Sequence, residues 1–333
     1  MPVSAKDIAK KLNISPSAVS LALNDKAGVS EQLRRLVIDT AKEMGYDMGR
    51  VKLGSALKGR TAYVVYSRHG TVVGDNPFFA DLEMSLVQRC RERGYHMETL
   101  LLTSGDDIPG RLAELGRRGM EGAVLLGTEL RREELVPFLT FDRPLVVLDA
   151  YFEGTDACFV GINNRQGAYI AAMKLIGLRR GQPGYLRSTY PIQNFRERAG
   201  GFFQAVRECG LSTSNSVVHR LSPSIEGAYA DMKALLASGE KTAACYFADN
   251  DLIAIGAMRA LQEAGYRIPE DVGLIGFDNT DLAESAEPKL CSVNVPRQVL
   301  GRAAGDALAG LISSPFLRFR LELKTDLILR KSL

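Results

Sequence analysis

The chain has 333 residues, of which 46% are hydrophobic, and its formal net charge is +3. This length exceeds what one hydrophobic core normally covers and suits a small domain followed by a two-lobed one. No signal peptide or membrane-spanning stretch is visible, which argues against a periplasmic receptor, so we expect a cytoplasmic protein with no membrane partner.

Residues 5–24 predict two short helices that meet at a tight turn. Apolar residues keep helical spacing up to Leu12 and resume it at Val19. Ser15 is a suitable N-cap and Pro16 suits the first helical position, so a second helix should begin there. This layout is typical of a helix-turn-helix, in which the start of the second helix contacts base edges in the major groove. Similar helix pairs occur in folds that bind no DNA, so the motif alone leaves both interpretations open.

A third helix is predicted from residue 31 to 44, with Ser30 as its N-cap and Gly45 as its stop signal. Residues 1–60 carry 11 Lys and Arg against 6 Asp and Glu, whereas the rest of the chain is slightly acidic. Because Lys and Arg supply most sequence-independent affinity for DNA, this localised charge favours DNA binding. The expected DNA-binding residues of these helices and the segment after them are Lys6, Ser15, Pro16, Ser17, Ser20, Leu21, Asn24, Ser30 and Arg50.

The run D-I-A-K-K-L-N-I-S-P-S-A-V-S-L-A-L-N, followed by V-S and a helix ending at G-Y, resembles the headpiece of the LacI/GalR family of transcriptional regulators. The resemblance implies a short hinge helix after Tyr46 that inserts a leucine into the minor groove. The chain departs from the family there, because no proline follows the tyrosine and neither Leu53 nor Leu57 has the usual spacing. We take Leu57 as the inserted residue; the alternative is that residues 48–60 are a flexible linker.

Beyond Thr61 the chain alternates β-rich runs with amphipathic helical stretches, and this pattern starts afresh after residue 160. Such alternation predicts βαβ units and two lobes with parallel sheets. The segments A-D-N-D-L-I-A-I-G-A-M-R-A-L and R-I-P-E-D-V-G-L-I-G-F-D-N-T resemble the effector-binding core of the same family, which has a periplasmic-binding-protein-like architecture. The predicted division is an all-α headpiece at 1–47, a hinge or linker at 48–60, and an effector-binding and dimerisation domain at 61–333. Within it, lobe 1 is predicted at 61–160 plus 294–316, and lobe 2 at 161–293 plus 317–330.

Polar residues follow several predicted strands, where ligands of open α/β sheets bind. Carboxylates and an arginine fork at such ends are suited to a hydroxyl-rich ligand. The resemblance adds an arginine and apolar walls to the same cleft. The expected effector-binding residues are Phe78, Phe79, Asp149, Asn163, Arg198, Phe247, Asn250 and Asp278. Helix capping is the alternative for the strand-end residues Asp149, Asn250 and Asp278, and burial in the core is the alternative for the phenylalanines.

Catalysis finds little support in the sequence. His69, His96 and His219 are scattered, and no H-E-x-x-H, P-loop or G-x-S-x-G motif is present. The five cysteines lack C-x-x-C spacing, so we expect no catalytic residue, metal ion or cofactor.

The sequence therefore predicts a homodimeric DNA-binding regulator that binds a pseudo-palindromic double-stranded operator, most simply as a repressor. A small hydroxyl-rich effector, a sugar or a sugar derivative, would control its operator affinity. Two alternatives stay open: a small-molecule receptor whose headpiece no longer binds DNA, and a sugar-modifying enzyme on the same two-lobed fold.

Overall fold

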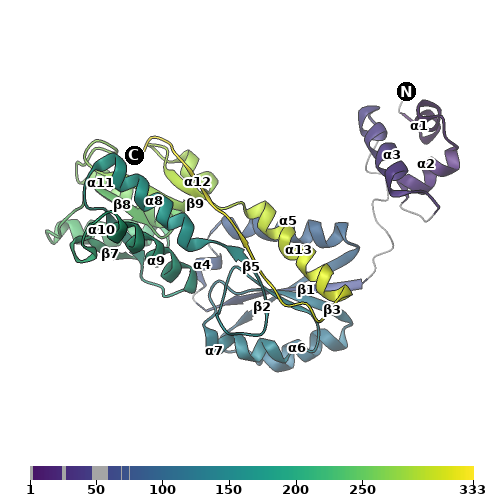
Figure 1. Ribbon diagram of the computed structural model, residues 1–333, viewed down its shortest axis with the longest axis horizontal. Helices are drawn as coiled ribbons and strands as arrows, with labels where there is room; N and C mark the ends of the chain where they lie inside the picture. The colour runs from purple at the N-terminus through teal and green to yellow at the C-terminus, as the bar shows by residue number, and fades with distance from the viewer. Residues whose placement is uncertain (1–2, 25–27, 47–58, 69, 75) are drawn as a thin grey trace.

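The computed structural model describes residues 3–24, 28–46, 59–68, 70–74 and 76–333. Its first three helices form the headpiece (Figure 1). They are α1 (Ala5–Leu12), α2 (Pro16–Leu23) and α3 (Glu31–Glu43). The predicted caps are confirmed, since the Ser15 hydroxyl accepts from the Ala18 N–H at 3.1 Å and the Ser30 hydroxyl from the Leu33 N–H at 3.2 Å.

Each headpiece helix contributes a fully buried side chain to one small core. Ile8 of α1, Val19 of α2 and Val37 of α3 are all 0% exposed. Helices of 8 to 13 residues are too short to be stable alone in water, so this shared core stabilises all three.

The remainder of the described chain forms two lobes, each built on a six-stranded sheet. The first sheet has the order β11-β5-β4-β3-β1-β2, and all of its strands are parallel. Its strands are β1 (Gly59–Ser67), β2 (Tyr95–Thr103), β3 (Met120–Leu126), β4 (Leu145–Leu148), β5 (Cys158–Ile162) and β11 (Arg320–Leu323). The helices of this lobe are α4 (Thr71–Gly74), α5 (Phe78–Glu92), α6 (Ile108–Arg117), α7 (Arg132–Leu135), the 3-10 helix η2 (Val136–Thr140) and α13 (Arg297–Ser313).

The second sheet has the order β12-β10-β9-β8-β6-β7, and only β12 runs antiparallel to its neighbour among these strands. Its strands are β6 (Gly184–Ser188), β7 (Val218–Leu221), β8 (Cys245–Ala248), β9 (Gly273–Asp278), β10 (Cys291–Asn294) and β12 (Asp326–Ile328). The helices of this lobe are α8 (Asn164–Arg179), α9 (Gln193–Glu208), the 3-10 helix η3 (Thr213–Asn215), α10 (Ile225–Ala237), α11 (Asp251–Glu263) and α12 (Asp281–Ser285).

One predicted boundary is wrong. Residues 317–330 were expected in lobe 2, but β11 pairs in parallel with β5, with Arg320 opposite Phe159, and so belongs to lobe 1. The chain crosses to lobe 2 only at residues 324–325, before β12 pairs with β10. Together with the connections from β5 to α8 and from β10 to α13, this makes three crossings between the lobes.

Both sheets are covered on both faces, which explains the nearly continuous apolar runs of their strands. On β1, Tyr63 and Val65 pack with residues of α5 and α13, whereas Val64 and Tyr66 pack with residues of α6 and η2. In lobe 2, α8 and α9 cover one face of the sheet, and α10 and α11 cover the other. None of the described helices is long and apolar enough to span a membrane.

Helices α5 and α13 lie against each other (Figure 1), and Gly301 of α13 lies at their contact. A Cβ atom on Gly301 would lie 2.5 Å from the carbonyl oxygen of Leu82 and 2.9 Å from the backbone nitrogen of Leu86. Gly310, on the same helix α13, has no atom within 4 Å of the equivalent position. The absence of a side chain at Gly301 therefore sets the distance between these two helices.

We expect Gly301→Ala to lower the free energy of unfolding by about 1–3 kcal/mol, because the backbone of α5 must move to admit the methyl group. Gly310→Ala is the matched control and should raise stability by up to about 1 kcal/mol, the helix preference for alanine over glycine. Urea denaturation of both variants measures the difference. Equal shifts of the same sign would contradict the close approach.

Candidate functional site

The described headpiece exposes most of the residues predicted to read DNA. Pro16, Ser17 and Ser20 are exposed on α2, and Lys6 is exposed on α1. Leu21 is half-buried beside the loop residue Gly28. The start of α2 therefore presents an uncharged surface of small hydroxyl and apolar groups.

The remaining headpiece candidates have local structural roles or fall outside the described residues. The Ser15 and Ser30 hydroxyls cap α2 and α3, and the Asn24 side-chain amide donates to the Ser20 carbonyl at 2.8 Å. Arg50 and Leu57 lie outside the described residues, so their roles stay predictions.

Three of the predicted effector residues meet in a buried polar network between the lobes. Arg198 of α9 extends one guanidinium nitrogen toward the Asp278 carboxylate at 3.4 Å, and both side chains are less than one-tenth exposed. Its Nε donates to Asn164 Oδ1 at 2.9 Å, and another nitrogen donates to the Asp249 carbonyl. The guanidinium also stacks 3.6 Å from the centre of the Phe277 ring, so Arg198 is held on every side.

Lobe 1 meets this network through Asp149, directly after β4. The Asp149 carboxylate accepts from the Thr128 hydroxyl at 2.7 Å, and its carbonyl accepts from the Asn194 amide of lobe 2 at 3.1 Å. Asn76, just before α5, hydrogen-bonds to the Asp278 carboxylate across the same boundary. Asp149 and Asp278 have φ of 58° and 104°, a conformation that costs energy in residues with a side chain and is concentrated at functional sites.

The network contains more carboxyl groups than cations. Burial raises the pKa of Asp149 to about 6 and that of Asp249 to about 6, and it raises the pKa of Asp278 despite the nearby Arg198. Burial, together with the Asp278 charge, raises the pKa of Asp251 to about 7. These carboxyl groups are suited to accept hydroxyl hydrogen bonds, or to donate one when protonated.

The other predicted effector residues occupy different positions. Asn163 and Asn250 cap α8 and α11, each accepting a backbone N–H at 2.9 Å. Phe247 is 0% exposed and stacks with Tyr185 at 5.5 Å in the core, so it is not a cleft wall in this structure. Phe78 and Phe79 are buried in an edge-to-face pair at 5.1 Å.

Sequence reasoning missed several polar partners in the network, namely Asn76, Thr128, Asn164, Asn194, Asp249 and Asp251. Three of these partners lie next to predicted effector residues: Asn164 follows Asn163 in the run N-N-R, and Asp249 and Asp251 flank Asn250 in the run A-D-N-D. Within the described residues, no group of three or more His, Cys, Asp or Glu is placed to hold a metal ion.

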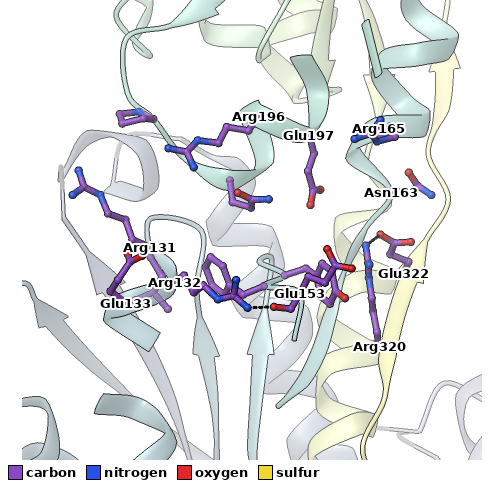
Figure 2. A pocket seen from close by; sticks show the side chains of 15 residues that line it. Arg131, Arg132, Glu133, Glu153, Asn163, Arg165, Arg196, Glu197, Arg320 and Glu322 are labelled. Carbon is purple, nitrogen blue, oxygen red and sulfur yellow. Dashed lines mark hydrogen bonds and ion pairs between the residues drawn. The ribbon is translucent and has the colours of Figure 1, made fainter. Parts of the chain in front are cut away.

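A cleft of about 800 Å³ lies between the lobes beside this network (Figure 2). Its lobe 1 wall consists of residues 130–133 and 151–153 together with Arg320 and Glu322. Its lobe 2 wall comes from the starts of α8 and α9 and from Pro191, two residues before α9. Of the predicted effector residues only Asn163 lines this cleft, whereas Asp149 lines a small neighbouring cavity of about 10 Å³ that shares four of its lining residues.

Comparison with known proteins agrees with this architecture. Residues 4–47 match the model for bacterial regulatory proteins of the lacI family, and residues 175–333 match a periplasmic binding protein-like domain. A ribose operon repressor from Haemophilus influenzae is 28% identical over 334 residues, covering 98% of each chain. The chain belongs to the LacI family of bacterial regulatory proteins. The resemblance and the fold class expected from the sequence are thereby confirmed.

Two solved structures of LacI-family regulators extend the comparison. A complex of the transcriptional regulator CelR with cellobiose superimposes with a TM-score of 0.72 at 26% identity, covering 99% of each chain. The Lac repressor dimer bound to operator and the anti-inducer ONPF has a TM-score of 0.72 at 20% identity, covering 100% of this chain and 99% of that one, and shows the shared fold.

Asp251 predicts a pH dependence of stability. Its pKa is about 7 in the folded protein against an ordinary 3.8, so the folded state holds this proton where the unfolded state has lost it. The free energy of unfolding should therefore fall as pH rises from about 4 to 7, by up to about 1.4 kcal/mol per pH unit.

Asp251→Asn should make this slope shallower, because the amide cannot ionise and only the other buried carboxyl groups then contribute. Its oxygen can still accept from the Thr280 N–H, and its NH₂ can donate to the Ser292 hydroxyl, which turns to accept. Thermal unfolding between pH 5 and 8 measures the slopes, with the exposed Asp142→Asn as control. An unchanged slope in Asp251→Asn would contradict the assignment.

Proposed function

We propose that this LacI-family chain is a sequence-specific DNA-binding repressor whose operator affinity is controlled by a small hydroxyl-rich effector bound between its lobes. The network of Asp149, Arg198 and Asp278 carries this proposal. It joins polar groups of both lobes at the carboxyl ends of their strands, where ligands of such sheets bind. A headpiece with an exposed α2 start lies on the same chain.

The effector is a sugar or sugar derivative. A carboxylate accepts two hydroxyl hydrogen bonds, and a guanidinium fork donates several, which together suit adjacent hydroxyl groups. The ribose operon repressor and the CelR–cellobiose complex support a carbohydrate class for this chain.

Effector binding acts through the relative orientation of the lobes. Arg198, Asn194 and Asp278 belong to lobe 2, whereas Asp149 and Asn76 belong to lobe 1. A ligand that replaces these direct contacts has different affinities for different lobe orientations, and the coupling to DNA is as large as that difference.

The active form is a homodimer, and its operator is pseudo-palindromic. Met84 of α5, Leu101 of the edge strand β2 and Val299 of α13 are each more than half exposed on neighbouring elements of lobe 1. Burial of these side chains against a second copy stabilises association. A two-fold dimer places two headpieces on two half-sites. A repressor acting on operator DNA works in the cytoplasm.

Binding to operator DNA tests the headpiece assignment. We expect the intact protein to bind genomic operator fragments with two chains per duplex, and with affinity that falls steeply with salt. Lys6→Gln should weaken binding to every sequence and lower the salt slope by about one. Fluorescence anisotropy over a salt series measures both.

Lys331→Gln is the control for charge alone, since Lys331 is exposed at the far end of the chain. Absent or salt-insensitive binding by the intact protein would defeat the repressor function and favour a receptor with an inactive headpiece.

Arg198→Lys should lower effector affinity at least about tenfold, because an ammonium group replaces a planar fork that donates in several directions at once. Operator affinity without effector should stay at the wild-type value, since the buried charge is kept. Effector affinity is measured by calorimetric titration with the sugar that most raises the unfolding temperature. Operator affinity is measured by fluorescence anisotropy. An unchanged effector titration would remove Arg198 from the site, and Arg207→Lys on α9 is the matched control.

A further inference from the structure

The interlobe cleft has a lining that a neutral sugar does not fully explain. Five arginines and four glutamates line it. They are Arg131, Arg132, Arg165, Arg196, Arg320, Glu133, Glu153, Glu197 and Glu322. Such a concentration of guanidinium groups in one cleft is typical of recognition of phosphate or carboxylate groups.

Some of these arginines have partners within the protein. Arg320 pairs with Glu322 and stacks 3.5 Å from the centre of the Tyr151 ring. Arg132 donates to the Glu153 carbonyl (Figure 2). Both side chains are thereby held against the lobe 1 wall.

The other three arginines lack such partners. In the described ranges of the chain, no carboxylate lies within ion-pair distance of the guanidinium groups of Arg131, Arg165 or Arg196, although the Arg131 backbone N–H donates to Glu134. Figure 2 shows Arg131 on the lobe 1 wall and Arg196 on the lobe 2 wall, both on the same side of the cleft that they line. Two like charges without a counter-ion oppose closure of the cleft.

We propose that this cleft binds a hydroxylated ligand that carries an anionic group, a sugar phosphate or a sugar acid, with the anion bridging Arg131 and Arg196. The anion replaces repulsion between the walls with charge-assisted hydrogen bonds to both lobes. The Glu133 and Glu153 carboxylates accept from hydroxyl groups of the same ligand. A neutral sugar uses only these acceptors and leaves the two guanidinium charges uncompensated.

The cleft is also connected to the buried network. Glu197, in its lining, accepts from the Asn164 amide at 3.3 Å, and the Asn164 oxygen accepts from Arg198 Nε at 2.9 Å. Burial raises the pKa of Glu197. This inference rests on the proposed function only in taking the bound anion as the effector.

Calorimetric titration of the full chain with paired ligands tests the charge requirement. The pairs are ribose with ribose 5-phosphate, glucose with glucose 6-phosphate, and glucose with gluconate, and inorganic phosphate is the minimal probe. We expect one anionic member to bind at least about tenfold more tightly than its neutral partner. The phosphate and carboxylate arms identify which anion the cleft prefers.

The double variant Arg131→Gln/Arg196→Gln tests the bridge. It should lose at least about tenfold in affinity for the anionic ligand, whereas its affinity for the neutral sugar should stay the same or rise, because the repulsion between the walls is gone. Arg117→Gln/Arg207→Gln removes two exposed arginines from the ends of α6 and α9 and is the matched control, with wild-type binding expected. The unfolding temperature without ligand shows whether each variant is folded.

Equal affinities within every pair, or wild-type binding by the cleft variant, would overturn the proposal. So would the absence of any anion binding up to about 10 mM, the weak limit for a specific small-molecule site. Operator titrations in parallel separate the two questions. Anion binding without operator binding would support the cleft assignment and contradict the repressor function. Operator release by neutral sugars alone would support the repressor function and contradict the cleft assignment.

Discussion

A single buried guanidinium organises the boundary between the lobes. Arg198 is fixed by Asn164, by the Asp249 carbonyl, by Asp278 and by the Phe277 ring, all within lobe 2. A buried charge is stable only when it is paired and hydrogen-bonded, so these contacts are mutually dependent. The Asp149 carboxyl of lobe 1 feels the same positive charge, so Arg198 also acts electrostatically across the lobe boundary.

The three crossings between the lobes limit how they can move. Each crossing lies directly after a strand of one sheet and before an element of the other lobe, so the lobes are tethered along one side. Arg297, at the third residue after β10, donates to Asp81 of α5 at 2.6 Å and to the Asn279 carbonyl at 2.9 Å. It thus ties both lobes close to a crossing, which favours rotation about this side over separation.

Local signals made the headpiece and the alternation of strands and helices predictable. The Ser15 and Ser30 hydroxyls accept hydrogen bonds from backbone N–H groups only three residues away. The spacing of apolar residues predicts which face of each helix is buried. The division between β11 and β12 was not predictable in this way, since it depends on distant partners in different sheets. The sequence around Phe247 fits either a residue of the cleft wall or a residue of the core. Its stacking with Tyr185, from another strand, shows that it belongs to the core. The cleft arginines escaped notice because they come from separate segments of both lobes.

Asn164 makes the two parts of the candidate site one physical unit. Its amide has a donor and an acceptor end, and it uses the donor on Glu197 of the open cleft and the acceptor on buried Arg198. A ligand that draws Glu197 away leaves the Asn164 donor unpaired in a buried position, which costs free energy until the amide or the arginine moves. Movement of Arg198 in turn changes its contact with Asp278, whose carboxylate is bound by Asn76 of the other lobe. Asn164 therefore connects the open cleft to the lobe boundary through a short series of polar contacts, from Glu197 through Arg198 to Asp278.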